Sequence, residues 1–155
     1  MTAWYSSSAP ACWACAAGTT GSPSAWTGWS LLALPVSLVP VCPEVFGGLP
    51  TPRMPAERQG ERVRALDGRD VTENYRRGAE EALRLARLLG ARTALLKERS
   101  PSCGCGAIYD GSFTGALVPG RGVAAALLQE SGIEVFGESG LDALLARLAE
   151  GGAAP

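Results

Sequence analysis

The chain has 155 residues and no histidine, and its first 43 residues contain no Asp, Glu, Lys or Arg. The absence of histidine excludes catalysis by an imidazole base and metal sites with histidine ligands. The formal net charge of −1 and the pI of about 5.5 do not predict a broad basic surface for nucleic acid or for anionic membranes. The length is typical of a single domain that buries a sizeable core.

The charge-free segment also holds all four tryptophans of the chain, which are Trp4, Trp13, Trp26 and Trp29. About a quarter of the residues in an average protein are charged, so roughly 11 are expected in a segment of this length. A signal peptide is not indicated, because a basic start and a continuous apolar stretch are both missing. Residues 31–41 are too short for a membrane helix and are interrupted by proline. We expect residues 1–30 to be disordered or irregular.

From residue 38 onward, predicted strands alternate with predicted helices. Short apolar runs place the strands at 38–41, 93–96 and 133–136. Apolar periodicity places the helices at about 70–89, 123–129 and 141–149. The alternation favours an α/β fold, in which helices flank a small parallel sheet in a Rossmann-like three-layer arrangement.

The helix at 70–89 has the clearest signals. Asp70 with Glu73 three residues later is typical of a helix start, and Gly90 is typical of a helix end. Its apolar face is formed by Tyr75, Ala79, Ala82, Ala86 and Leu89. Two other stretches predict no regular element: residues 57–64 are charged and expected to be exposed, and residues 109–115 are rich in turn signals.

The five cysteines, Cys12, Cys15, Cys42, Cys103 and Cys105, lack the spacing of a disulfide framework. Their odd number favours a reducing compartment or metal binding. Cys42 and Cys103 each follow a predicted strand. Because ligands bind beyond the carboxyl ends of parallel strands, the fold could bring these two thiols together.

The stretch Ser100-Pro101-Ser102-Cys103-Gly104-Cys105-Gly106 can curl so that several backbone N–H groups converge on one point. Such a curl suits an anionic ligand, including a sulfur-bound metal cluster. The alternative is a strand-to-loop turn with two incidental thiols. Arg53, in the loop after Cys42, could recognise an anion or a planar polar group, or it could be a solvated loop arginine.

Four stretches carry a family resemblance: V-P-V-C-P-E-V at 39–45, G-G-L-P-T-P-R at 47–53, K-E-R-S-P-S-C-G at 97–104 and Y-D-G at 109–111. Together they resemble a small bacterial family of 2-thiouracil desulfurases, long labelled a domain of unknown function (DUF523). The resemblance covers about residues 38–137. It implies a [4Fe–4S] cluster held by three cysteines, whose fourth iron takes the sulfur of a thiolated nucleobase.

The resemblance assigns roles to individual residues. Cys42 and Cys103 match two cluster ligands, whereas Cys105 matches none. Glu44 would carry a proton or activate water, and Ser100 would orient substrate or water. The alternative for Glu44 is an exposed carboxylate after a strand, and the alternative for Ser100 is a turn cap. Arg53 and Ser102 are expected to bind substrate. The implied partner is a small thiolated nucleobase in the cytoplasm, with no nucleic acid or membrane.

The chain departs from the family at its start. The family's motif S-A-C-L-L-G-x-x-C-R-Y-D-G, which holds the third ligand, and the strand before it are absent from residues 1–37. We back-translated residues 8–21 and joined the third base of each codon to the first two bases of the next codon. This shifted frame permits S-A-C-L-L-G-V-R-C-R-Y-D-G. The codons of Cys12-Trp13 allow only Leu, and those of Trp13-Ala14 allow only Gly, and both residues fall at the motif's positions. Our hypothesis is that residues 1–37 arise from a frameshift and that residues 38–150 form the desulfurase-like domain.

This hypothesis predicts weak cluster binding and little activity for the chain as written. The alternatives are a non-catalytic remnant that binds a cluster or sulfide, and a thiol-redox protein that uses Cys103 and Cys105. The spacing of these two cysteines gives poor geometry for a disulfide.

Overall fold

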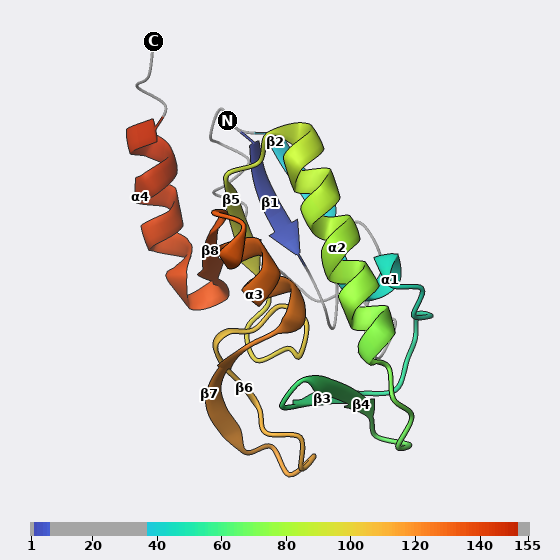
Figure 1. The fold of residues 1–155 in the computed structure, drawn as a ribbon. Helices are drawn as coiled ribbons and strands as arrows, with labels where there is room; N and C mark the ends of the chain where they lie inside the picture. The colour runs from blue at the N-terminus through green and yellow to red at the C-terminus, as the bar shows by residue number, and fades with distance from the viewer. Residues whose placement is uncertain (1, 7–36, 152–155) are drawn as a thin grey trace.

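The computed structural model describes residues 2–6 and 37–151. A four-stranded parallel sheet in the order β2–β1–β5–β8 forms its centre (Figure 1). The strands are β1 (Thr2–Ser6), β2 (Ser37–Val41), β5 (Thr93–Leu96) and β8 (Glu134–Gly137). The apolar runs therefore predicted three strands correctly to within a residue or so. Residues 1–30 were expected to be disordered or irregular, but residues 2–6 form β1, which lies between β2 and β5.

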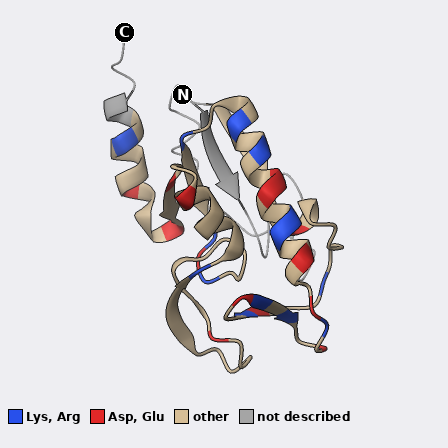
Figure 2. Cartoon of the chain, viewed as in Figure 1, with Lys and Arg blue, Asp and Glu red and all other residues tan. Residues whose placement is uncertain are grey.

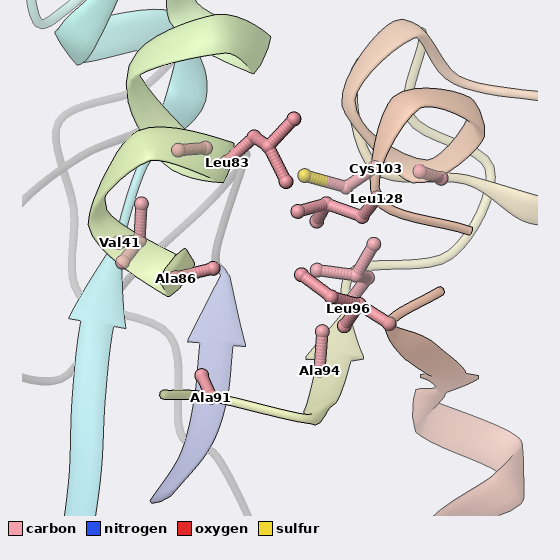
Figure 3. Packing of buried hydrophobic residues seen from close by; sticks show 11 residues of the cluster. Val41, Leu83, Ala86, Ala91, Ala94, Leu96, Cys103 and Leu128 are labelled. Atoms are coloured by element: carbon pink, nitrogen blue, oxygen red, sulfur yellow. The ribbon is translucent and has the colours of Figure 1, made fainter. Parts of the chain in front are cut away.

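Helices cover both faces of this sheet, which confirms the predicted three-layer α/β fold. On one face lie α2 (Thr72–Leu89) and α3 (Val123–Glu130), which pack side by side, and on the other lies α4 (Leu141–Gly151). Figure 3 shows the first interface, where Leu83 and Ala86 of α2 meet Leu96 of β5 and Leu128 of α3. On the α4 face, Leu95 packs with buried leucines of the helix.

The helix α2 follows its sequence signals closely. It begins at Thr72, whose backbone N–H donates to Asp70 Oδ1 at 2.9 Å, so Asp70 acts just before the start of the helix. Gly90 ends the helix in the left-handed conformation, at φ 64°. The predicted apolar face is buried except for Leu89, which is 40% exposed. Nowhere in the part of the chain that the structure describes is a helix both long and apolar enough to cross a bilayer.

Two antiparallel hairpins lie beyond the carboxyl end of β1 (Figure 1). The first joins β3 (Ala56–Gln59) to β4 (Arg62–Ala65), and the second joins β6 (Cys105–Tyr109) to β7 (Leu117–Arg121). The expectation that residues 57–64 are exposed holds for residues 59–62 but is wrong for Glu57 and Val63, which are buried. Figure 2 shows charges of both signs mixed along this first hairpin and along α2.

A buried carboxylate ties the two hairpins together. Glu57 of β3 accepts the backbone N–H groups of Gly111 and Phe113, each at 2.9 Å, from the loop between β6 and β7. Gln59 adds a bond from its side-chain nitrogen to the carbonyl of Gly111. Because buried N–H groups need acceptors, Glu57 fixes this loop against the first hairpin.

Candidate functional site

Cys42 and Glu44 are delivered by the chain turn that follows β2. Val41 ends the strand, Cys42 caps the short helix α1 (Pro43–Phe46), and Glu44 lies in its first turn. Cys42 is 5% exposed and Glu44 is 4% exposed. The alternative of an exposed carboxylate after a strand is therefore wrong.

Glycines let α1 lie directly against α2. A Cβ atom on Gly78 of α2 would lie 1.8 Å from the carbonyl oxygen of Pro43, and one on Gly47 would lie 2.0 Å from that of Asn74. Asn74 also donates to the carbonyl of Gly47 at 2.8 Å. No side chain fits between the two helices at these points, so backbone contact sets the position of Cys42 and Glu44.

Arg53 reaches the same place from the loop that follows α1. Its Nε donates to Glu44 Oε2 at 2.6 Å, and both side chains are almost fully buried. Its Nη1 donates to the carbonyl of Pro50 and to the hydroxyl of Thr51, and its Nη2 lies 3.7 Å from Cys42 Sγ. The alternative of a solvated loop arginine is therefore wrong: the guanidinium joins the carboxylate to the thiol.

Burial perturbs both ionisable groups beside this arginine. Burial raises the pKa of the Glu44 carboxyl, although the charge of Arg53 and a hydrogen bond from Tyr75 oppose the shift. Burial also raises the pKa of the Cys42 thiol, against the stabilising effects of the Val45 backbone N–H and of Arg53. Perturbed groups that gather at one point are typical of functional sites.

Tyr75 is a part of the site that sequence reasoning did not find. It lies in the first turn of α2 and is 2% exposed, and it lowers the pKa of the Glu44 carboxyl. It also interacts electrostatically with Arg53 and Cys103, and burial raises the pKa of its hydroxyl. The sequence placed Tyr75 only on an apolar helix face. The hydroxyl of Tyr75 could have indicated a site, because a tyrosine hydroxyl on a buried helix face usually needs a polar partner.

The loop after β5 places Ser100, Ser102 and Cys103. The hydroxyl oxygen of Ser100 accepts the backbone N–H groups of Ser102 and Cys103, at 3.1 and 3.3 Å. Ser100 is therefore a turn cap, which was the alternative role expected for it. Because its hydroxyl oxygen accepts both bonds, its own proton can still be donated. The carbonyl of Ser102 accepts the N–H groups of Ala124 and Ala125, which anchors the loop to the start of α3.

Ser102 also carries an unsatisfied hydroxyl. Its side chain is fully buried, and its Oγ has no hydrogen-bond partner among the residues that the structure describes. A buried hydroxyl without a partner is costly, and such a group in a native protein calls for a ligand or a water. Ser102 directly precedes Cys103 in the sequence.

Cys103 is a fully buried thiol. In Figure 3 its sulfur points toward Leu83 of α2, with Leu128 of α3 close by. It belongs to the apolar cluster that also holds Val41, the residue before Cys42. The structure thus brings Arg53 into contact with Glu44 and Cys42, and it places Cys103 in the core beside the end of β2.

Within residues 2–6 and 37–151, no group of three or more Cys, Asp or Glu side chains could hold a metal ion by itself. Two buried thiols are nevertheless the donors that iron–sulfur clusters use, so Cys42 and Cys103 fit as part of a ligand set. Cys12 and Cys15 lie outside the described residues. Cys105 is partly exposed, and burial and the carboxylates of Glu98 and Glu138 raise its pKa, which disfavours a reactive redox thiol.

A pocket of about 400 Å³ opens beside the buried group. Arg53 and Tyr75 line it together with apolar side chains, including Leu49, Pro50 and Met54. Its volume lies in the range of small-ligand sites, which are mostly apolar with a few polar groups that fix orientation. The pocket therefore gives a small molecule access to Arg53 and Tyr75.

Comparison with known proteins identifies the family. Residues 23–140 match the family model of the 2-thiouracil desulfurases. The chain belongs to this family. The match begins earlier than the expected residue 38, so it includes part of the segment assigned to a frameshift.

Two relatives of this desulfurase-family chain are informative. An uncharacterised protein of Bacillus subtilis (strain 168), YbbK, is 43% identical in an alignment of 117 residues that covers 69% of this chain and 78% of that protein. The solved structure of TudS, a [4Fe–4S]-dependent thiouracil desulfidase, is 48% identical, with a TM-score of 0.78 over 84% of this chain and 88% of that one. The predicted family resemblance is confirmed.

Proposed function

We propose that this chain removes sulfur from a thiolated pyrimidine of the 2-thiouracil type by hydrolysis, with the help of a [4Fe–4S] cluster. The observation that carries the proposal is the buried group of Cys42, Arg53, Glu44 and Tyr75 beside a pocket of small-ligand size. In the overall reaction, water replaces the C=S sulfur by oxygen, and the sulfur leaves as sulfide. The membership of the family and the similarity to TudS support this assignment.

In this proposal, Cys42 and Cys103 would hold the cluster as thiolates. When bound, the cluster would supply an iron that acts as a Lewis acid toward the substrate sulfur. Arg53 lies close enough to Cys42 to offset the negative charge that gathers there. The third ligand is not assigned, because the described residues supply two suitable thiols.

Three polar side chains would act on the substrate and water. Glu44 would carry the proton that the hydrolysis moves, a role that suits a buried carboxyl held in one orientation by Arg53. Ser100 would donate its hydroxyl proton to substrate or water. The unsatisfied hydroxyl of Ser102 would bond a ring nitrogen or oxygen of the base.

A second candidate is a non-catalytic remnant that binds a cluster or sulfide. The observation in its favour is that Cys42 and Cys103 are the two suitable thiols in the described part of the chain, while the family's third ligand motif is absent from the sequence. Both candidates place the protein in a reducing compartment such as the cytoplasm, where buried thiols persist.

The test is anaerobic reconstitution with iron and sulfide, followed by iron counting, absorbance of the cluster and sulfide release from 2-thiouracil. Replacement of Cys42 or Cys103 by Ser should abolish iron binding, whereas Cys105→Ser, the matched control, should leave it unchanged. Sulfide release supports the enzyme, and iron binding without sulfide release supports the remnant. Retention of iron in both the Cys42→Ser and Cys103→Ser variants would refute the ligand assignment.

A further inference from the structure

The pocket beside Arg53 is lined by two alanines of the first hairpin. Ala56 of β3 and Ala65 of β4 both line it, and they lie directly opposite each other in the antiparallel pair. Residues that lie directly opposite in such a pair project their side chains from the same face of the hairpin. This part of the pocket wall therefore consists of two neighbouring methyl groups, which we call the alanine wall.

The alanine wall is fixed in place by the core behind it. Ala65 is 4% exposed and shares an apolar cluster with Val63 and Tyr75, and Ala56 packs against the same cluster. Glu57, which follows Ala56 in β3, accepts two backbone N–H groups from the loop between β6 and β7. Because alanine has no side-chain rotamers to change, the wall cannot move aside or close up around a ligand. It sets a fixed limit to the pocket.

The polar end of the pocket points to the assigned cluster ligand. Arg53 lines the pocket, and its Nη2 lies 3.7 Å from Cys42 Sγ. In the proposed function, the C2 sulfur of the pyrimidine faces this end. Position C5 lies across the ring from C2, so a substituent on C5 would point away from Cys42, toward the apolar part of the pocket. Pockets of about 300–1,000 Å³ hold drug-sized molecules, so the 400 Å³ found here exceeds what a bare pyrimidine ring fills.

We propose that Ala56 and Ala65 determine the substrate specificity of the site, by forming an apolar wall that admits 2-thiouracils with a small apolar substituent at C5. The inference rests on the proposed function. A methyl group at C5 would leave water and pack against the wall, whereas a longer side chain at either position would take up the space that this methyl group needs. The alternative is that this part of the pocket never contacts the substrate.

Binding can be measured without turnover in the full chain before reconstitution, where no cluster consumes the substrate. With ¹³C-labelled alanine methyl groups, addition of 5-methyl-2-thiouracil should shift the NMR signals of Ala56 and Ala65, because an aromatic ring changes the shielding of a methyl group beside it. The methyl signal of Ala143, which is exposed on α4, should not shift. The affinity should be about fourfold higher than that for 2-thiouracil, the effect of burying one more methyl group.

Two substitutions extend the wall into the pocket, Ala65→Leu and Ala56→Leu. In the reconstituted chain, the ratio of kcat/KM for 5-methyl-2-thiouracil to that for 2-thiouracil should fall at least about tenfold in each variant. Ala65 is buried, so leucine there can destabilise the hairpin by overpacking, whereas Ala56 is only partly buried and provides the second test. The iron content should stay within about twofold of the unmodified chain, because the hairpin supplies no cluster ligand. Ala143→Leu is the matched control and should leave the ratio unchanged.

The failure of this inference can be told apart from the failure of the proposed function. Sulfide release from the unmodified chain with no shift of either methyl signal overturns the alanine wall and leaves the function standing. A selectivity ratio that is unchanged in both leucine variants also overturns it. If the unmodified chain releases no sulfide, the proposed function fails. The methyl shifts and the relative affinities of the two compounds for the variants then decide whether the wall contacts the base.

Discussion

The contact between α1 and α2 predicts that Gly78→Ala destabilises the protein, although alanine favours helices. A Cβ on Gly78 would lie 1.8 Å from the carbonyl oxygen of Pro43 and 3.1 Å from the nitrogen of Gly47. Both contacts are with backbone, so relief requires α1 to move by roughly 1 Å in a closely packed region. Cys42 and Glu44 would move with it.

The magnitude follows from two opposing effects. Glycine to alanine inside a helix usually stabilises it by about 1 kcal/mol, whereas overpacking of a filled interior costs about 1–3 kcal/mol. Because the clash here is with backbone and cannot be relieved by a rotamer change, we expect overpacking to dominate. The free energy of unfolding should fall by up to about 2 kcal/mol, the difference between these two effects.

Urea denaturation of the cluster-free chain measures the stability, and iron counting after anaerobic reconstitution measures the displacement of Cys42. Glu80 is exposed on the same helix, so the difference between Glu80→Ala and Glu80→Gly calibrates the intrinsic preference for alanine. Gly47→Ala tests the same contact from the other helix. If Gly78→Ala stabilises the chain by as much as the Glu80 pair predicts, the backbone contact does not fix α1.

Other predictions follow from single buried contacts. Arg53→Met leaves the Glu44 carboxylate buried without its partner, so the free energy of unfolding in urea should drop by about 3 kcal/mol; a loss below about 1 kcal/mol would contradict a buried ion pair. Glu57→Ala removes the acceptor of the Gly111 and Phe113 N–H groups. It should cost about 2 kcal/mol and speed hydrogen exchange at these two amides, and unchanged exchange would show that water replaces the carboxylate.

The fold could be predicted where local patterns and tertiary contacts agree. The apolar runs at 38–41 and 93–96 predicted β2 and β5, and the spacing of apolar residues predicted α2, because these elements bury one face or both against the core. The hairpin of β3 and β4 was missed, because its arginines and glutamates suggest exposure. That hairpin is specified by contacts with distant residues, such as those that Glu57 makes to Gly111.

The residues of the site also divide into those that the sequence could predict and those that depend on distant contacts. The carboxyl ends of parallel strands share an edge, so strand order alone indicated that Cys42 and Cys103 could lie near each other. Their expected role as cluster ligands came from the family resemblance. Tyr75 could not be assigned to the site from periodicity, because its ring fits an apolar helix face and the pocket that it lines is formed by other elements. Likewise, the burial of Arg53 depends on the path of the loop after α1, which no local pattern reveals.

The position of β1 sharpens the frameshift hypothesis. The strand lies between β2 and β5, so its carboxyl end at Ser6 lies between the strand ends that lead to Cys42 and Cys103. A cysteine supplied by the family motif soon after this strand would approach the same edge as the two assigned thiols. Restoring the shifted frame should therefore raise the iron content after reconstitution to about four per chain and increase sulfide release from 2-thiouracil.

Two measurements test the hypothesis independently of each other. The genomic DNA must contain codons over residues 8–21 that encode the motif in the shifted frame, and any incompatible codon refutes it. Iron counting compares the chain as written with the restored chain, and a full complement of iron in the former would show that its own residues complete the ligand set. Because the family match begins at residue 23, we expect the return to the normal frame nearer to that residue than to residue 37.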